Sequence, residues 1–160
     1  MEVSQLLGNI TFNNMGRRPR INRDKTSLWL RQIIESYNKN LIDLNYTFCT
    51  DQELLEINQE YLQHDYFTDI ISFDLSELKK EIHGDIYIST DRVKENAKYN
   101  KCTFEIELNR VLAHGLLHLI GFKDKTKKEI QAMRKAEDEA LAIWEKFQVS
   151  RETVKYKYKK

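Results

Sequence analysis

The most informative stretch of this chain reads HGLLHLIGFKD and spans residues 114–124. Its histidines, His114 and His118, are four residues apart, a spacing that stacks two side chains on one face of a helix. Gly121 stands where such a helix is expected to end, because glycine adopts left-handed backbone conformations without steric cost. A chain reversal at Gly121 would bring Asp124 back toward both imidazoles.

Two histidines and one carboxylate form a suitable ligand set for a catalytic metal ion, with a fourth position left for water. Zinc is the default ion for these donors, at one divalent ion per chain, although nickel, manganese and iron accept the same ligand types. The competing interpretation is that His114 and His118 are ordinary helix residues, because a His-x-x-x-His pair alone is a weak signal. Gly121 and Asp124 favour the metal.

The chain lacks the glutamate that zinc proteases carry beside their first histidine. Zinc proteases with this histidine spacing carry a glutamate after the first histidine as their general base, and this chain has Gly115 there. Peptidase activity is therefore disfavoured.

A second polar segment lies upstream, around a strand-like run at residues 70–75. Thr68, Asp69 and Ser72 precede or enter that run, and polar side chains on a loop that enters a sheet can line a cleft. The alternative is that these side chains only satisfy backbone groups in a turn.

Around these segments, helix-like and strand-like patterns are interspersed. Strands are expected at residues 10–13, 44–49, 70–75 and 85–89, and helices at about 25–37, 51–61, 91–99, 104–120 and 127–147. Thr50 and Thr126 each begin a capping box, and Thr90 or Asp91 can cap the third helix. The pattern predicts a mixed, roughly four-stranded sheet packed with about five helices.

Length and composition favour one globular domain. The chain has 160 residues, of which 41% are hydrophobic and 32% charged, which is enough apolar material for a core. We expect a single domain over residues 1–150 and a basic, frayed tail over 151–160, with RNA stacking as the alternative role of the tail. No apolar run reaches 18 residues, and residues 1–14 lack signal-peptide features, so a cytoplasmic protein without membrane association is expected.

The net charge of +1 is lower than a strongly basic nucleic-acid binder would show, but it leaves room for a local basic patch. Residues 16–23 read GRRPRINR, and their four arginines are candidates for following an RNA backbone: Arg17, Arg18, Arg20 and Arg23. A solvated basic loop is an equally good interpretation. Cys49 and Cys102 are expected to be two buried free thiols.

Three segments together resemble the YbeY family of metal-dependent endoribonucleases. The family pattern HGxLHLxGYDH matches residues 114–124, and its LGDIxIS strand matches GDIYIS at residues 84–89. Upstream, the pattern NxxYRxxDxPTDVLSFP matches these residues: Asn58, Tyr61, Asp65, Thr68, Asp69, Ser72 and Phe73.

The resemblance implies an α+β fold with a metal at the floor of a cleft, held by His114, His118 and Asp124. It further implies a single-strand-specific endoribonuclease that matures ribosomal RNA at the 16S 3′ end, in ribosome biogenesis. Its partners would be RNA and a ribosomal subunit or ribosome-associated proteins, and the protein is expected to be a monomer.

The chain departs from the family pattern in three places. At the metal site, Asp124 replaces the third histidine and Lys123 the aspartate before it. Leu62 replaces the arginine after the tyrosine, and Phe67 and Asp74 replace the prolines before Thr68 and after Phe73. Two alternatives therefore stay open: a ribosome-associated RNA-binding module with a structural or weakly active metal site, and a metal-dependent hydrolase of a non-nucleic substrate.

Overall fold

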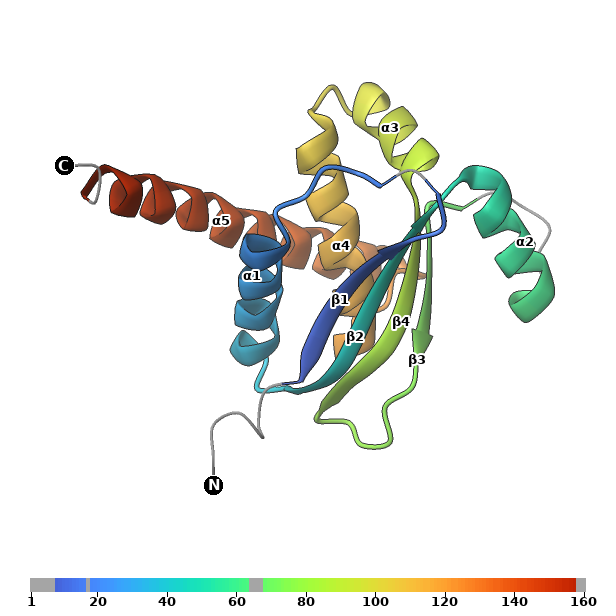
Figure 1. Ribbon diagram of the computed structural model, residues 1–160. Coiled ribbons are helices and arrows are strands. Elements are labelled where there is room, and N and C mark those ends of the chain that lie inside the picture. The colour runs from blue at the N-terminus through green and yellow to red at the C-terminus, as the bar shows by residue number, and fades with distance from the viewer. Residues whose placement is uncertain (1–7, 17, 64–67, 158–160) are drawn as a thin grey trace.

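The computed structural model describes the backbone of residues 8–16, 18–63 and 68–157, and side chains as far as residue 147. In this part of the chain, four strands and five helices form a single α+β domain, as the sequence predicted (Figure 1). In chain order the elements are β1 (Asn9–Asn14), α1 (Arg23–Ser36), β2 (Asn40–Cys49), α2 (Asp51–Leu62), β3 (Ile70–Asp74), β4 (Glu81–Ser89), α3 (Thr90–Tyr99), α4 (Phe104–Ile120) and α5 (Lys127–Lys157).

The four strands form one mixed sheet in the order β1-β2-β4-β3. β1 pairs parallel to β2, and β2 pairs parallel to β4, with Leu44 opposite Gly84. β3 pairs antiparallel to β4, with Ser72 opposite Ile86. β1 and β3 are therefore the two edge strands, on opposite sides of the sheet.

The main hydrophobic core lies between one face of the sheet and the helices α1, α4 and α5, which gather on that face in Figure 1. Alternate residues of the central strands point into it, among them Tyr46 and Ile86, both fully buried. Trp29 of α1 meets Trp144 of α5 edge to face, with ring centroids 5.2 Å apart. This contact packs α5 against α1.

The other face of the sheet is covered by α2 next to β3 and β4. Leu54 of α2 packs there with Cys49 and Ile71, and Phe73 and Tyr87 surround this smaller cluster. Because successive side chains of a strand point to opposite faces of the sheet, β3 contributes to both clusters. Ile71 points toward α2, whereas its neighbours Ile70 and Ser72 point toward α4.

Local capping signals set most helix starts as predicted. The Thr50–Glu53 capping box opens α2, and Thr126 and Glu129 exchange the same pair of hydrogen bonds before α5. The predicted cap of α3 was wrong: Ser89, the last residue of β4, accepts the hydrogen bond from the Arg92 amide, and Thr90 is already helical. Ser89 is extended, as a strand end requires, and that backbone conformation suits an N-cap.

Two strands begin four residues before the expected 44 and 85, β2 at Asn40 and β4 at Glu81, because these first residues pair with one another. Two further expectations need correction. α5 continues to Lys157 instead of ending near Phe147, so residues 151–157 of the expected tail are helical, and α5 extends past α1 away from the sheet (Figure 1). Both cysteines are free, but only Cys49 is buried, and Cys102 is partly exposed. In the part of the chain that the structure describes, no helix has the length and apolar character needed to cross a bilayer.

Candidate metal centre

The site is built at the C-terminal end of α4. The helix ends at Gly121, whose φ of 128° is unfavourable for residues with a side chain, and whose amide donates to the carbonyls of Leu117 and His118. The Phe122 amide also donates to the Leu117 carbonyl, which closes the reversal. The chain consequently folds back, and Asp124 returns to the helix face that carries the histidines, as predicted.

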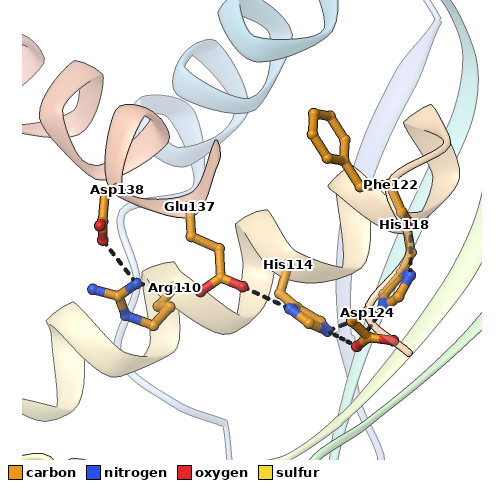
Figure 2. A network of polar contacts seen from close by, with 7 residues as sticks. All are labelled: Arg110, His114, His118, Phe122, Asp124, Glu137 and Asp138. Atoms are coloured by element: carbon orange, nitrogen blue, oxygen red, sulfur yellow. Dashed lines mark hydrogen bonds and ion pairs between the residues drawn. The ribbon is translucent and has the colours of Figure 1, made fainter. Parts of the chain in front are cut away.

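Three donor atoms converge at this point, and Figure 2 shows them facing one another. The Nε2 atoms of His114 and His118 are 3.0 Å apart. The Oδ2 atom of Asp124 lies 3.2 Å from Nε2 of His118 and 3.4 Å from Nε2 of His114. The His114 and His118 side chains are partly buried, at 23% and 29% exposure, whereas Asp124 is exposed at 40%.

These separations suit a single small cation. Two ligand atoms that each lie ~2.0–2.1 Å from a tetrahedral zinc ion are roughly 3.3–3.4 Å from one another. The three donor–donor distances, 3.0, 3.2 and 3.4 Å, are close to that value without rearrangement of the backbone. The His-His-Asp group could therefore hold a metal ion, and its nitrogen and oxygen donors are of the type that zinc accepts.

The opposite ring nitrogen of each histidine has an acceptor of its own. Nδ1 of His118 lies 3.0 Å from the backbone oxygen of Phe122, and Nδ1 of His114 lies 2.8 Å from Oε2 of Glu137. A carbonyl oxygen and an ionised carboxylate can only accept, so each Nδ1 donates its proton and each neutral ring has its lone pair on Nε2. Two lone pairs and a carboxylate then face each other, an arrangement that requires a positive charge among them.

The raised pKa of His114 also indicates that the site favours a positive charge. Burial acts to lower the pKa of His114, but the hydrogen bond to Glu137 and the nearby charges of Glu137, Asp69 and Asp124 outweigh it and raise the pKa above its ordinary value. The site thus attracts positive charge, either a proton or a metal ion.

The donors line a cavity of about 450 Å³ between α4, β3 and the end of α2. Thr68, Asp69 and Ser72 line the same cavity, so the structure places these three predicted residues beside the histidines. Burial raises the pKa of Asp69, and the attraction of His114 only partly opposes that effect. Leu62 also lines the cavity, which means that the departure from the family pattern at this position changes the cavity wall.

The arginines of the predicted basic loop lie elsewhere. Arg18 and Arg23 lie beside Phe12 and Phe48, near the ends of β1 and β2, and Arg20 lies near Glu105 and Trp144. None of these three lines the cavity that contains His114. Arg17 and Asp65 lie outside the described residues.

Sequence spacing did not indicate Glu137, which the structure adds to the site. Glu137 is 23 residues from His114 and lies on another helix, where a single glutamate in an α5 rich in charged residues carries no distinguishing signal. Its burial, at 6% exposure, distinguishes it only after α5 has packed against α4.

Comparisons with known proteins agree with this architecture. The family profile described as Endoribonuclease YbeY matches residues 11–145. A curated relative from Cytophaga hutchinsonii, named Endoribonuclease YbeY, is 52% identical over 121 residues, which cover 76% of this chain and 85% of the relative. A relative of the same name from Bacteroides thetaiotaomicron is 41% identical over 135 residues, covering 84% and 98% of the two chains.

A solved structure has a similar fold. A solution structure of a Thermotoga maritima protein aligns with a TM-score of 0.61 and 27% identity, and covers 86% of this chain and 93% of the other. The family profile thus spans most of the described fold, including the histidine helix and the turn that follows it. This chain belongs to the YbeY endoribonuclease family.

Proposed function

We propose that this protein is a metal-dependent endoribonuclease that hydrolyses phosphodiester bonds in single-stranded RNA. Family membership supports the reaction class, since the curated relatives are named endoribonucleases. The observation that carries the metal dependence is the convergence of three donor atoms within 3.0–3.4 Å, with the two Nδ1 atoms already engaged elsewhere. His114, His118 and Asp124 would hold one divalent ion, with zinc as the first candidate.

When bound, such an ion would act as a Lewis acid on the phosphodiester and lower the pKa of a coordinated water. The chain itself orients the donors through the Phe122 carbonyl and Glu137, and shapes the cavity that receives the RNA. The hydroxyls of Thr68 and Ser72 and the carboxyl group of Asp69 line that cavity and are the candidates for contact with substrate.

The charge of the cavity explains why a cation is needed. Three of its lining residues are carboxylates, Asp69, Asp74 and Asp124, and no lysine or arginine occurs among the described residues that line it. An RNA phosphate would be repelled by these carboxylates, so a divalent ion would have to offset the repulsion. A single strand is the proposed substrate, because its unstacked nucleotides can be splayed out to reach donors inside a cavity.

The cellular role that we propose is maturation of ribosomal RNA at the 16S 3′ end in the cytoplasm, with the ribosomal subunit or its associated proteins as partners. Arg18, Arg20 and Arg23 are proposed to contact RNA phosphates away from the cleaved bond, since they lie outside the cavity.

The test is cleavage of a fluorescent single-stranded RNA by purified protein, before and after removal of metal by a chelator, together with elemental analysis. We expect about one equivalent of metal per chain and a loss of cleavage on chelation that added zinc or manganese restores. Asp124→Ala should lower the cleavage rate by on the order of 10²-fold or more, because one of three ligands is lost.

Asp74→Asn is the matched control, because it neutralises a carboxylate of the same cavity outside the three-donor group. Cleavage that survives both chelation and Asp124→Ala would refute the proposal. RNA binding without turnover would instead favour an RNA-binding module with a structural metal. The cavity gives that alternative one observation of its own, because Leu62 occupies its wall in place of the family arginine.

A further inference from the structure

A buried carboxylate on α5 contacts one histidine of the proposed metal site, on the side of the ring that faces away from the other two donors. Oε2 of Glu137 lies 2.8 Å from Nδ1 of His114, and the Glu137 side chain is only 7% exposed (Figure 2). Glu137 does not belong to the three-donor group, because it contacts the far side of the His114 ring. A carboxylate this deeply buried needs polar partners on both oxygens to offset its lost hydration.

Arg110 provides the second partner. It lies one helical turn before His114 on α4, and its Nη1 atom donates to Oε1 of Glu137 at 3.2 Å and to Oδ1 of Asp138 at 3.1 Å. Each oxygen of Glu137 therefore has one partner, Arg110 for Oε1 and His114 for Oε2. The hydrogen bond from the charged Arg110 guanidinium holds the Glu137 side chain with Oε2 directed at Nδ1 of His114.

The two histidines consequently differ in the acceptor that their Nδ1 atoms contact. His118 donates from Nδ1 to a neutral backbone carbonyl, that of Phe122, whereas His114 donates to a charged carboxylate. A carboxylate partner pulls the Nδ1 proton more strongly, which increases electron density at Nε2 and makes the ring a better metal ligand. It also prevents the ring from rotating about its χ2 bond.

We propose that Glu137 is a positioning residue of the metal site, which fixes His114 with its proton on Nδ1 and strengthens Nε2 as a ligand, while Arg110 holds the Glu137 side chain in place. This inference rests on the proposed metal-binding function. According to this inference, α5 affects metal affinity although it supplies none of the three donors.

Three variants distinguish the effect of the Glu137 hydrogen bond on the orientation of His114 from the effect of the Glu137 charge. Glu137→Gln keeps an oxygen that can accept from His114 but removes the charge, and the amide then faces Arg110, which retains Asp138. Glu137→Ala removes both the acceptor and the charge. Asp138→Asn is the matched control, because Asp138 contacts the same arginine but not His114.

Zinc affinity is measured by competition with a chromogenic chelator on full-length protein. We expect Glu137→Ala to bind zinc about 10–100-fold more weakly than wild type, Glu137→Gln to lie between the two, and Asp138→Asn to match wild type within about twofold. Equal affinities for Glu137→Gln, Asp138→Asn and wild type would overturn the inference, and the proposed metal function would still stand. If Glu137→Ala fails to fold, Glu137→Gln decides the question.

A second measurement uses the metal-free protein. Imidazole ¹⁵N chemical shifts, recorded at a pH well above the ordinary histidine pKa, identify which ring nitrogen carries the proton. His114 should be protonated on Nδ1 in wild type and Asp138→Asn and become a mixture of tautomers in Glu137→Ala, while His118 stays unchanged. A His114 ring protonated on Nε2 in wild type would contradict the inference. If wild type bound no zinc, the proposed function would fail, and the tautomer would still test the positioning role.

Discussion

At the scale of single residues, Asp124 distinguishes this site from a three-histidine site. A carboxylate gives the donor set a charge of −1, and its oxygen is a harder ligand than an imidazole nitrogen. The geometry tolerates the exchange, because Oδ2 of Asp124 lies 3.2 and 3.4 Å from the two Nε2 atoms, similar to the 3.0 Å that separates those atoms. Asp124 is therefore expected to affect which metal binds more than whether one binds.

Replacing Asp124 by histidine tests this expectation. Asp124→His should retain zinc and lose manganese affinity, so that the preference for zinc over manganese rises by on the order of tenfold, because imidazole favours zinc and carboxylate favours manganese. Competition titrations with both ions measure the ratio. Asp74→His is the control, as it makes the same exchange on the same cavity wall outside the donor group. An unchanged or lower ratio in Asp124→His would contradict the argument.

At the scale of elements, two glycines set how closely α4 approaches the sheet. A Cβ atom on Gly115 of α4 would lie 2.8 Å from Cδ1 of Ile70 and 3.0 Å from Cδ1 of Ile86. A Cβ atom on Gly84 of β4 would lie 2.7 Å from the backbone oxygen of Phe73 and 2.8 Å from a methyl group of Leu119. Gly84 is the less tolerant position, because a strand backbone cannot move aside as a side-chain methyl group can.

Gly84→Ala is therefore expected to lower the free energy of unfolding by roughly 1–3 kcal/mol, the usual cost of overpacking a core. Urea denaturation followed by tryptophan fluorescence measures it. Gly16→Ala serves as the control, since a Cβ atom on Gly16, in the loop after β1, would have nothing within 4 Å, and the substitution should change stability by less than about 0.5 kcal/mol. Equal effects of the two substitutions would show that Gly84 is not needed for close contact with β3 and α4.

At the scale of the whole molecule, the donors and their supports come from different parts of the fold. His114, His118 and Asp124 belong to α4 and the turn after it, Glu137 belongs to α5, and β3 forms part of the cavity wall. Metal binding should thus stabilise the assembled domain, since the unfolded chain does not hold these groups together.

Thermal unfolding with increasing free zinc tests this coupling. At a free zinc concentration 100 times the Kd, the native state should gain about 2.7 kcal/mol, which corresponds to several degrees in Tm for a chain of this length. Asp124→Ala should show a much smaller shift, and Asp74→Asn should behave like wild type. A shift of the same size in Asp124→Ala would place the stabilising zinc at another site.

Local sequence patterns were sufficient to predict the elements and the face of α4 that carries both histidines. The spacing of His114 and His118, and the reversal at Gly121, are local features, because helix periodicity and glycine backbone freedom act over a few residues. The positions of the four strands were predictable for the same reason, although not the first residues of β2 and β4, and so were the starts of α2, α4 and α5. The third helix was not, because Thr90 follows a serine that can also cap and whose extended backbone is set by strand pairing.

The surroundings of the site, in contrast, depend on how the elements pack. The sheet order puts β1 and β3 at opposite edges, so the basic loop after β1 lies away from the cavity, and the sequence contains no signal of that separation. Glu137 reaches His114 only because α5 packs against α4. The physical reason is that contacts between elements depend on which faces pack against each other. A pattern of a few neighbouring residues does not determine that packing.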